Sequence, residues 1–373
     1  MGAAAACGVF LLFAGCGQFF PPLTSGTGTG TNSGDYLYVG NLDGDTIGGL
    51  TFADSTLSTL SGSPFASVAT PVALAVTPNN DYLYVGGGDS EEVAMYPIDS
   101  DGVLGSGSLE GSFSPAALRV DTTGGWLIGI DAIYNEIYSF QIDTSNGSLT
   151  APLSSSTVTL PNCDIANDMA GLSPGLVITP DDTYIYASCG TAGIDAFSFD
   201  SSSGAIAYVG TLSPKTSGAA DSGLAIATNS SVDYLLAAET VTNAVRVFSI
   251  ASNGQFTEVS GSPFTTGSGP DAVLVDSTDT YAYVANRAAD TISGFTIGSG
   301  GALTAISGSP FSTGSLPVAL VEDSSDTYVA AICYGGSSDL ETYTIGTGGA
   351  LTSFKNSATG SDPTEASSGA ATH

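Results

Sequence analysis

The chain repeats one pattern of apolar and polar positions along most of its length. Its clearest copy is 281–286, where an aromatic residue opens a short alternating run that ends in a polar turn, and a second alternating run follows at 291–297. Alternation with a period of two predicts half-buried β-strands. The aromatic residue that opens the run recurs at Tyr36, Tyr82, Trp126, Tyr184, Tyr234, Tyr281 and Tyr328.

Two further strands complete each unit. The second strand is followed by a glycine-bearing turn in six of the seven units, and a third strand leads into the sequence Ser-Gly-Ser-Pro-Phe at 61–65, 260–264 and 307–311. A strand that begins with proline opens the next unit, as at 71–76, 270–275 and 317–321. Four short antiparallel strands in each repeat are typical of propeller blades, which bury their apolar faces only by stacking on one another. We therefore predict an all-β, seven-bladed β-propeller of four-stranded antiparallel blades.

The two ends of the chain are expected to close the ring. The first unit has only three strands, and the tail at 363–372 supplies a fourth that begins with proline. Pairing of the N- and C-terminal segments within one blade would remove an open sheet edge. The expected blades are about 35–65 plus 363–373, 71–113, 115–160, 173–213, 222–264, 270–311 and 317–360.

The net charge of the chain narrows the range of its possible binding partners. The chain has 36 acidic and 5 basic residues, and its net charge of −31 disfavours nucleic acid and anionic membrane surfaces. One loop, 41–45, places oxygen ligands at alternate positions as a calcium loop does, but Thr46 and Phe52 stand where such a loop needs glycine and glutamate. We expect no cofactor, with calcium as the alternative.

The N-terminus predicts export. Residues 3–14 form an apolar run that is too short to span a membrane. The run ends in Phe-Ala-Gly-Cys and resembles the signal of bacterial lipoproteins, which implies a signal peptide at 1–15, lipidation of Cys16 and a flexible linker at 16–34. An ordinary secretory signal is the alternative. We expect a monomeric propeller on the bacterial cell envelope, held to a membrane only by its lipid.

Export also favours disulfide formation. Cys163 lies in the longest connection between blades, and Cys189 ends a strand on the same face of the ring. We predict a Cys163–Cys189 disulfide, with buried free thiols as the alternative. The cysteines lack the spacing of metal ligands.

Polar residues mark one rim of the propeller. The residues that end the aromatic strands are Asn41, Gly87, Asp131, Cys189, Glu239, Asn286 and Cys333, and Asp43, Asp45, Asp89, Arg287 and Asp290 lie close to them in sequence. Arg119 is expected on the proline-led strand of the second blade, nearest the channel. Asn41, Asn286, Arg119 and Asp290 are candidates for ligand binding.

The same rim holds candidate catalytic groups. Glu239 and Asp131 are candidate general bases, and Arg287 is a candidate for stabilising an oxyanion. For all of these residues the alternative is local capping of strand ends. The only histidine is His373, so a Ser-His-Asp set is excluded.

The repeats resemble a known family. Tyr-Val-x-Asn at 38–41 and 283–286, together with Ser-Gly-Ser-Pro-Phe and the proline-led strands, is similar to the lactonase-type seven-bladed propellers, which include 6-phosphogluconolactonases and carboxymuconate cyclases. The resemblance covers about 35–373 and implies lactone chemistry by a histidine with Arg and Glu residues in the channel. No blade contains a histidine other than the last residue of the chain, His373, and the negative charge opposes an anionic substrate.

Three functions remain open. The leading one is a cell-envelope lipoprotein whose rim binds a small molecule, a glycan or an envelope protein. The alternatives are a lactonase acting in carbohydrate metabolism and a calcium-stabilised adhesion or scaffold module.

Overall fold

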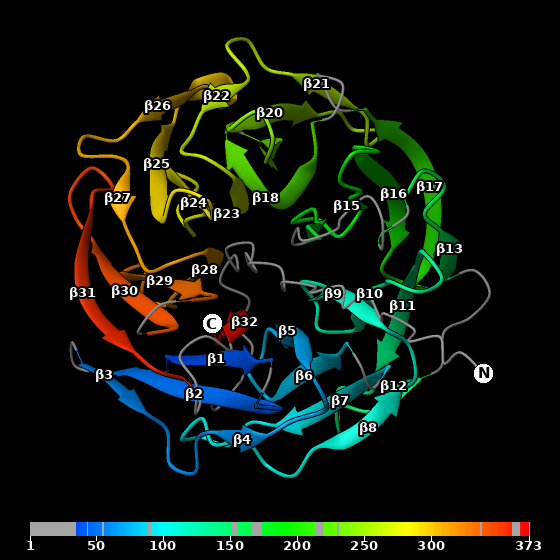
Figure 1. Ribbon diagram of the computed structural model, residues 1–373. Coiled ribbons are helices and arrows are strands. Elements are labelled where there is room, and N and C mark those ends of the chain that lie inside the picture. Colours follow the sequence, from blue (N-terminus) through cyan, green and yellow to red (C-terminus); the bar gives the residue numbers. More distant parts are fainter. Residues whose placement is uncertain are drawn as a thin grey trace, which may run out of the picture.

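Seven antiparallel sheets stand around a central axis in the computed structural model of the protein (Figure 1). The structure describes residues 35–42, 44–53, 56–88, 91–150, 156–163, 165, 174–213, 219–229, 231–335, 338–359 and 366–372. Almost all of its regular structure is β-strand, and the predicted seven-bladed propeller is confirmed. Within these ranges, no helix is both long and apolar enough to cross a membrane.

The blades follow one another around the ring in chain order, and each is built from an innermost strand outward. The first blade has β32 (Ala366–Ala371), β1 (Tyr36–Asn41), β2 (Thr46–Ala53), β3 (Thr56–Thr59) and the short β4 (Phe65–Ala66). The second has β5 (Pro71–Val76), β6 (Tyr82–Gly87), β7 (Glu92–Pro97) and β8 (Ser108–Gly111). The third has β9 (Pro115–Val120), β10 (Trp126–Asp131), β11 (Glu136–Ile142), β12 (Leu149–Thr150) and β13 (Thr157–Thr159).

The remaining four blades follow the same plan. The fourth has β14 (Leu176–Ile178), β15 (Tyr184–Ser188), β16 (Ile194–Asp200) and β17 (Ala205–Leu212). The fifth has β18 (Asp221–Asn229), β19 (Val232–Glu239), β20 (Ala244–Ile250), β21 (Phe256–Glu258) and β22 (Phe264–Thr265). The sixth has β23 (Pro270–Val275), β24 (Tyr281–Asn286), β25 (Thr291–Ile297), the 3₁₀ turn η1 (Ser299–Gly301), β26 (Leu303–Ala305) and β27 (Phe311–Ser312). The seventh has β28 (Pro317–Glu322), β29 (Tyr328–Cys333), β30 (Leu340–Ile345) and β31 (Leu351–Ser357).

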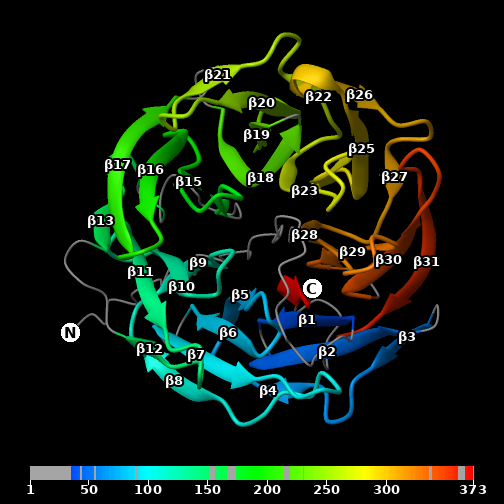
Figure 2. The same cartoon turned by 180° about the vertical axis from the view of Figure 1, so that it is seen from behind.

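The chain ends close the ring as predicted. The C-terminal strand β32 pairs antiparallel with β1, with Leu37 opposite Ala371 and Val39 opposite Gly369. Seen from either side, β32 lies inside β1 at the axis (Figures 1 and 2). Each innermost strand lies beside the innermost strands of the two neighbouring blades, so the ring has no open edge at its centre.

Aromatic residues of one blade and glycine turns of the next hold neighbouring blades together. The hydroxyl groups of Tyr38 and Tyr84 donate to the carbonyl oxygens of Gly102 and Gly147, at 2.7 and 2.6 Å. A Cβ atom on Gly102, whose φ is 76°, would lie 2.4 Å from the ring of Tyr36. The aromatic strand and the glycine turn that recur in the sequence are therefore two halves of one contact between blades.

The Ser-Gly-Ser-Pro-Phe segments also have a repeated role. In the first, fifth and sixth blades the segment lies between the two short outer strands, and its second serine accepts a hydrogen bond from the neighbouring strand. The hydroxyl oxygens of Ser63, Ser262 and Ser309 accept from the backbone N–H groups of Gly49, Val247 and Gly294, at 2.8, 3.1 and 2.9 Å. This contact satisfies an amide where the outer strand is interrupted.

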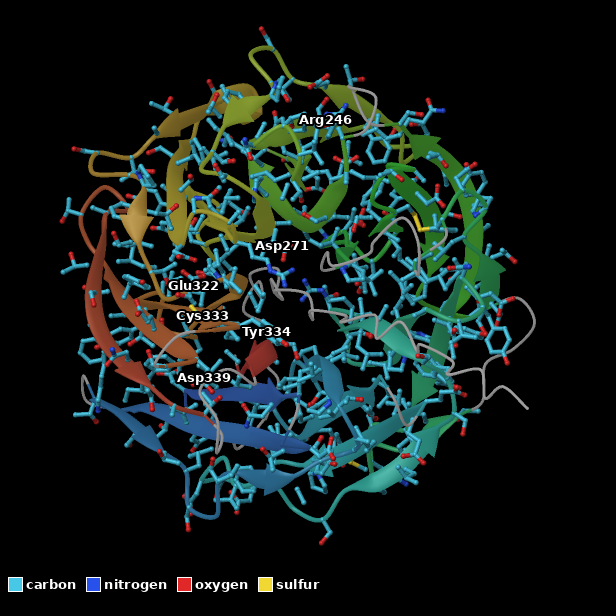
Figure 3. The ribbon with its side chains drawn as sticks, viewed as in Figure 1. Arg246, Asp271, Glu322, Cys333, Tyr334 and Asp339 are labelled. Carbon is cyan, nitrogen blue, oxygen red and sulfur yellow. A yellow bond between two sulfur atoms is a disulfide. The ribbon has the colours of Figure 1, made fainter. Side chains whose placement is uncertain are left out.

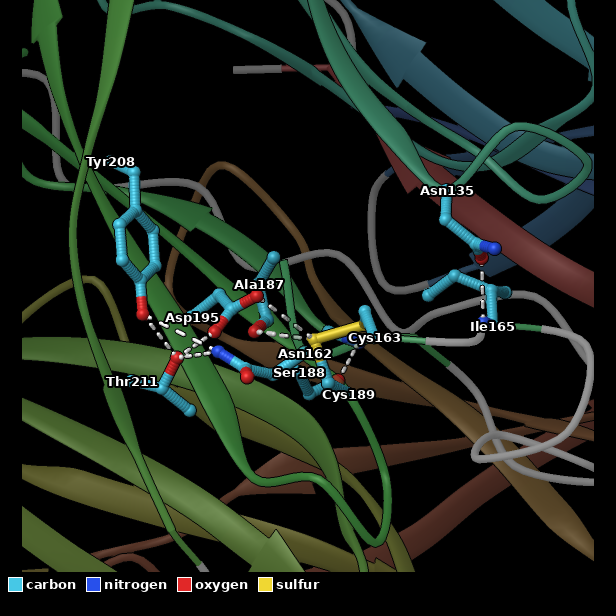
Figure 4. The surroundings of a disulfide bond; sticks show 11 residues. Asn135, Asn162, Cys163, Ile165, Ala187, Ser188, Cys189, Asp195, Tyr208 and Thr211 are labelled. Carbon is cyan, nitrogen blue, oxygen red and sulfur yellow. Dashed lines mark hydrogen bonds between the residues drawn. A yellow bond between two sulfur atoms is a disulfide. The ribbon is translucent and has the colours of Figure 1, made fainter. Parts of the chain in front are cut away.

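A disulfide fastens the long connection between the third and fourth blades (Figure 4). The sulfur atoms of Cys163 and Cys189 are bonded, as the sequence predicts, and the preceding Asn162 donates to the hydroxyl of Thr211 at 2.7 Å. Cys333 is a buried free thiol. Cys16, with the predicted signal peptide and linker, lies outside the described residues.

Candidate functional site

The predicted rim lies on the face where the aromatic strands end. We call this side the mouth face. It carries the turns that follow β1, β6, β10, β15, β19, β24 and β29 and the connections between blades. Asn41, Asp131, Glu239 and Asn286 all lie there, and all are buried.

Asp131 is held by the turn that follows it. Its Oδ1 accepts hydrogen bonds from the backbone N–H groups of Ile133 and Tyr134, at 2.7 and 2.8 Å, and its Oδ2 accepts from Ser114 N at 3.2 Å. Both carboxyl oxygens are therefore occupied by backbone amides of the turn and of the connection from the second blade. The geometry of Asp131 is that of a strand-end cap.

Two other predicted rim residues, Asp45 and Asp290, also hold loops in place, as does Asn243 at the corresponding position of the fifth blade. The side-chain oxygens of Asp45, Asn243 and Asp290 accept from the backbone N–H groups of Thr70, Gly269 and Leu316, at 2.7, 2.9 and 2.8 Å. In each case a turn residue with positive φ fixes the connection that enters the next blade. Of the remaining rim candidates, Asp43 and Asp89 lie outside the described residues, as does His373.

The two rim asparagines contact the strand beside them. Asn41 Nδ2 donates to Thr46 Oγ1 and to the carbonyl oxygen of Thr359, both at 3.1 Å. Asn286 Nδ2 donates to Thr291 Oγ1 at 3.1 Å and to Ser293 Oγ at 2.9 Å.

Arg119 lies on β9, the innermost strand of the third blade, and its expected place in the second blade was wrong. Its side chain is 5% exposed, and its Nε donates to the carbonyl oxygen of Leu176 on β14, at 2.9 Å. Arg119 therefore joins the innermost strands of two neighbouring blades rather than facing solvent.

The fifth blade carries charged residues at positions where most other blades carry uncharged ones. In register, Asp221 lies opposite the rim residue Glu239, at the position that four other blades fill with Pro71, Pro115, Pro270 and Pro317. Arg246 lies on β20 opposite Ala237, and the corresponding residues elsewhere are Gly48, Ala94, Tyr138, Asp195, Ser293 and Glu341. Arg246 is the only basic residue at that position.

These residues meet around one guanidinium group. Arg246 Nη1 lies 3.9 Å from Asp221 Oδ2 and 3.8 Å from Glu239 Oε1, and Nε lies 3.7 Å from Glu258 Oε1. The guanidinium also lies 4.6 Å from the ring centre of Phe248, and Glu239 accepts a hydrogen bond from Thr242 Oγ1. Four strands of one blade thus bring three carboxyl groups to one cation.

Asp221 is the member of this cluster whose protonation is most perturbed. Its pKa is raised to about 7, mainly by burial and to a smaller extent by the charge of Glu239, while Arg246 acts to lower it. The side chain is fully buried, and neither carboxyl oxygen accepts a hydrogen bond from a described residue. A carboxyl group that titrates near neutral pH beside a second carboxylate can take or give a proton.

The sixth blade carries a second charged pair. Arg287 Nη1 lies 3.6 Å from Asp271 Oδ2; the arginine side chain is 23% exposed and the aspartate side chain 1%. The corresponding pairs in four other blades are Val72 with Gly88, Ala116 with Ala132, Ser222 with Thr240, and Val318 with Tyr334. Polar pairs therefore occur side by side in the fifth and sixth blades.

We call Ser222, Thr240, Asp271 and Arg287 the polar sector. Thr240 Oγ1 donates to the carbonyl oxygen of Pro270 at 2.8 Å, so the fifth-blade half of the sector contacts the residue that precedes Asp271. Figure 3 shows Asp271 nearer the axis than Arg246, which lies farther out in its blade. The Arg246 cluster belongs to the blade that supplies Ser222 and Thr240, and it extends from the innermost strand, which carries Asp221, to β21, which carries Glu258.

The structure brings together only part of the predicted catalytic set. Glu239 and Arg287 lie on neighbouring blades, but the cation beside Glu239 is Arg246 and the carboxylate beside Arg287 is Asp271. Asp131 lies on the third blade. Sequence reasoning missed Asp221, Arg246 and Asp271. Aligning the repeats position by position would have shown that Asp221 stands where four other blades have proline. It would also have shown that Arg246 stands where the other blades have uncharged or acidic residues.

No metal centre is evident in the part of the chain that the structure describes. Within it, no group of three or more His, Cys, Asp or Glu side chains is arranged to hold a metal ion. The predicted calcium loop includes Asp43, which is not among the described residues.

Comparison with known proteins finds other propellers of similar fold. Residues 258–367 match the family described as lactonase, 7-bladed beta-propeller. No curated protein matches the sequence.

The periplasmic gluconolactonase of Pseudomonas aeruginosa superposes with a TM-score of 0.72 at 15% identity, covering 91% of this chain and 99% of that one. A candidate 6-phosphogluconolactonase of Bacteroides fragilis gives 0.72 at 18% identity, covering 93% and 100%. A protein from Lactobacillus plantarum gives 0.71 at 18% identity, covering 91% and 100%.

At these identities the solved structures show the fold, and the family match covers the end of the fifth blade, the whole sixth blade and the seventh. Both agree with the resemblance that the repeats predict. The chain thus has a lactonase-like seven-bladed β-propeller fold.

Proposed function

We propose that the protein is an exported, lipid-anchored propeller of the bacterial cell envelope that binds a small molecule, a glycan or an envelope protein at the polar sector of its mouth face. The observation that carries the proposal is the Asp271–Arg287 pair. Arg287 is a partly exposed guanidinium on the mouth face, and the buried Asp271 fixes its direction. In the other described blades these positions hold small, apolar, aromatic or hydroxyl side chains.

Binding agrees better with the geometry than catalysis by the predicted set. Asp131 is engaged by three backbone amides, and Glu239 is 1% exposed and contacts Arg246 and Thr242. Neither carboxylate is presented to a substrate as an open general base would be.

The test compares the intact protein with Arg287→Ala. Purified protein is titrated calorimetrically with an envelope extract fractionated into glycans, lipids and proteins. A fraction that binds the intact protein should bind Arg287→Ala at least about tenfold more weakly, because the ligand loses a charge-assisted donor. Lys355→Ala removes a cation from the outer strand β31 and serves as the matched control. Equal binding by the two variants would refute the site.

A lactonase is the second candidate, and the Arg246 cluster favours it. Asp221 has a pKa of about 7 and shares Arg246 with Glu239, an arrangement that suits proton transfer. The fold also matches that of the Pseudomonas aeruginosa periplasmic gluconolactonase. Turnover of a neutral lactone that Asp221→Asn and Glu239→Gln both abolish would establish this function in place of binding alone.

Two further parts of the proposal have separate tests. Palmitate labelling in cells should be lost in Cys16→Ser if Cys16 carries the lipid. A calcium-stabilised scaffold requires a melting temperature that rises with added calcium, and an unchanged melting temperature removes that alternative.

A further inference from the structure

We propose that Asp221 carries a proton in the folded protein and that loss of this proton, as pH rises, loosens the junction of the fourth, fifth and sixth blades at the mouth face. The junction responds to pH whether or not a ligand is bound at the polar sector. Two observations carry the proposal: the place of Asp221 between three blades, and the surplus of buried carboxyl groups around Arg246.

Asp221 begins the innermost strand of the fifth blade and lies where the two neighbouring blades meet it. Its backbone N–H donates to the carbonyl oxygen of Gly190 in the fourth blade at 3.0 Å. The hydroxyl oxygen of the next residue, Ser222, lies 3.1 Å from that of Thr240, which donates to the carbonyl oxygen of Pro270 in the sixth blade at 2.8 Å. A change in the charge of Asp221 therefore acts at the meeting point of three blades.

Carboxyl groups outnumber cations around Asp221. Its carboxyl group, with those of Glu239 and Glu258, surrounds the single guanidinium group of Arg246 at 3.7 to 3.9 Å. The side chains of Asp221, Glu239 and Arg246 are 0, 1 and 4% exposed. With every carboxyl group ionised, three negative charges would face one positive charge away from water. Because an uncompensated buried charge is very costly, one carboxyl group is expected to bind a proton.

Asp221 is the carboxyl group whose ionised form is least stabilised. Within the described part of the chain, neither of its oxygens accepts a hydrogen bond, and the 3.9 Å that separates Oδ2 from Arg246 Nη1 is too long for one. Glu239 accepts a hydrogen bond from Thr242, and Glu258 is 25% exposed. The raised pKa of Asp221, about 7, agrees with this ranking.

The elements packed against β18 bring no second cation to this point. In the fourth blade, β14 and β15 carry tyrosines as their only ionisable side chains, and η1 carries none. In the sixth blade, β23 carries Asp271, which is paired with Arg287. Asp233 lies at the far end of β19, opposite Thr228. Arg246 is thus the only basic residue on the described strands and turn that pack around β18.

The backbone beside Asp221 is packed too closely to admit much water. A Cβ atom on Gly223 would lie 2.4 Å from the carbonyl oxygen of Asp271, and one on Gly175 would lie 2.5 Å from that of Ser222. An ionised Asp221 needs hydration that this packing does not provide. Water reaches the carboxylate when β18 separates from its neighbours, so ionisation favours the open form of the junction.

The direction of the pH dependence follows from the two forms. The pKa of Asp221 is about 7 in the closed junction, and in an open, hydrated junction it returns toward the ordinary value of 3.8. The closed form thus holds the proton more tightly. Its stabilisation is complete below about pH 4, is lost as pH rises to about 7, and changes no further above that.

Hydrogen–deuterium exchange of the intact protein at about pH 5 and about pH 8 tests the proposal, once rates are corrected for the intrinsic effect of pH on amide exchange. Opening at 220–224 and 237–240 should be at least about tenfold more frequent at the higher pH. In Asp221→Asn, which has no proton to lose, opening should be the same at both. Segment 276–280, next to Glu322, is the internal control and should respond to pH equally in both proteins.

A second variant keeps the test decisive if Asp221→Asn does not fold. Glu239→Gln removes a charge that raises the pKa of Asp221, so the rise in opening should move to lower pH. Equal opening of the intact junction at the two pH values would overturn the proposal. So would a pH response that persists in Asp221→Asn or an unshifted one in Glu239→Gln.

Discussion

At the residue scale, the polar side chains of the mouth face divide into two groups. Asp45, Asp131 and Asp290 accept backbone hydrogen bonds and fix turns. Asp221 and Arg287 occupy positions where other described blades carry no charge, and they contact charged partners. The first group follows from turn chemistry. The second departs from the repeat and is where function should be sought.

Asp131→Ala should destabilise the protein strongly. The substitution leaves three backbone N–H groups without their acceptor in a buried turn, at a cost of about 2–4 kcal/mol. Thermal melting should show a clear fall in melting temperature, with a smaller fall for Asp131→Asn, whose amide oxygen still accepts. If the two variants melt with the intact protein, Asp131 does not cap the turn.

Glu322 should make stability depend on pH. Its pKa is raised to about 9, mainly by burial and to a smaller extent by nearby Asp276, Asp326 and Asp323, although Ser277 N donates to its Oε2 at 2.7 Å. The unfolded chain releases this proton near pH 4.5. Since the folded state holds the proton more tightly, stability should fall as pH rises from about 4.5 to 9.

Melting curves of the Glu322→Gln variant between about pH 4 and 9 test this dependence of stability on pH. The variant should melt a few degrees above the intact protein at pH 8, corresponding to roughly 1–2 kcal/mol, and close to it at pH 4. A difference that stays constant with pH would show that the carboxyl group does not titrate in this range.

At the element scale, each blade follows rules that are visible in the sequence. Alternation predicted the strands, and glycine turns and Ser-Gly-Ser-Pro-Phe marked their connections, because these features act within one blade or between neighbours. The pairing of β32 with β1 followed from the missing strand of the first unit. The blade of Arg119 was assigned wrongly, although a count of the repeats would have placed it correctly.

The Cys163–Cys189 disulfide should stabilise the fourth blade and the connection that enters it. The bond joins residues separated by 26 positions, and closing a loop of that length contributes about 3–4 kcal/mol in the chain-entropy model. A double variant, Cys163→Ser with Cys189→Ser, should melt well below the intact protein under oxidising conditions. A reducing agent should lower the melting temperature of the intact protein but not that of the variant, and the same response in both would contradict this role.

At the scale of the whole molecule, the ring decides which residues meet. Asp271 and Arg287 form a pair because the sixth blade places the second residue of β23 beside the residue that follows β24. The Arg246 cluster needs side chains from β18, β19, β20 and β21. Sequence spacing does not report such distances. Glu239 and Arg287 were therefore recognised as polar rim residues, while their actual partners, Arg246 and Asp271, were not.

The central claim is that the mouth face binds its ligand at the polar sector. Hydrogen–deuterium exchange with and without the envelope fraction that binds the intact protein tests it most directly, because exchange reports each segment separately. We predict slower exchange at 285–290, and no change in the turns of the opposite face at 121–125 and 276–280. Protection confined to the opposite face or to the outer strands would contradict the claim.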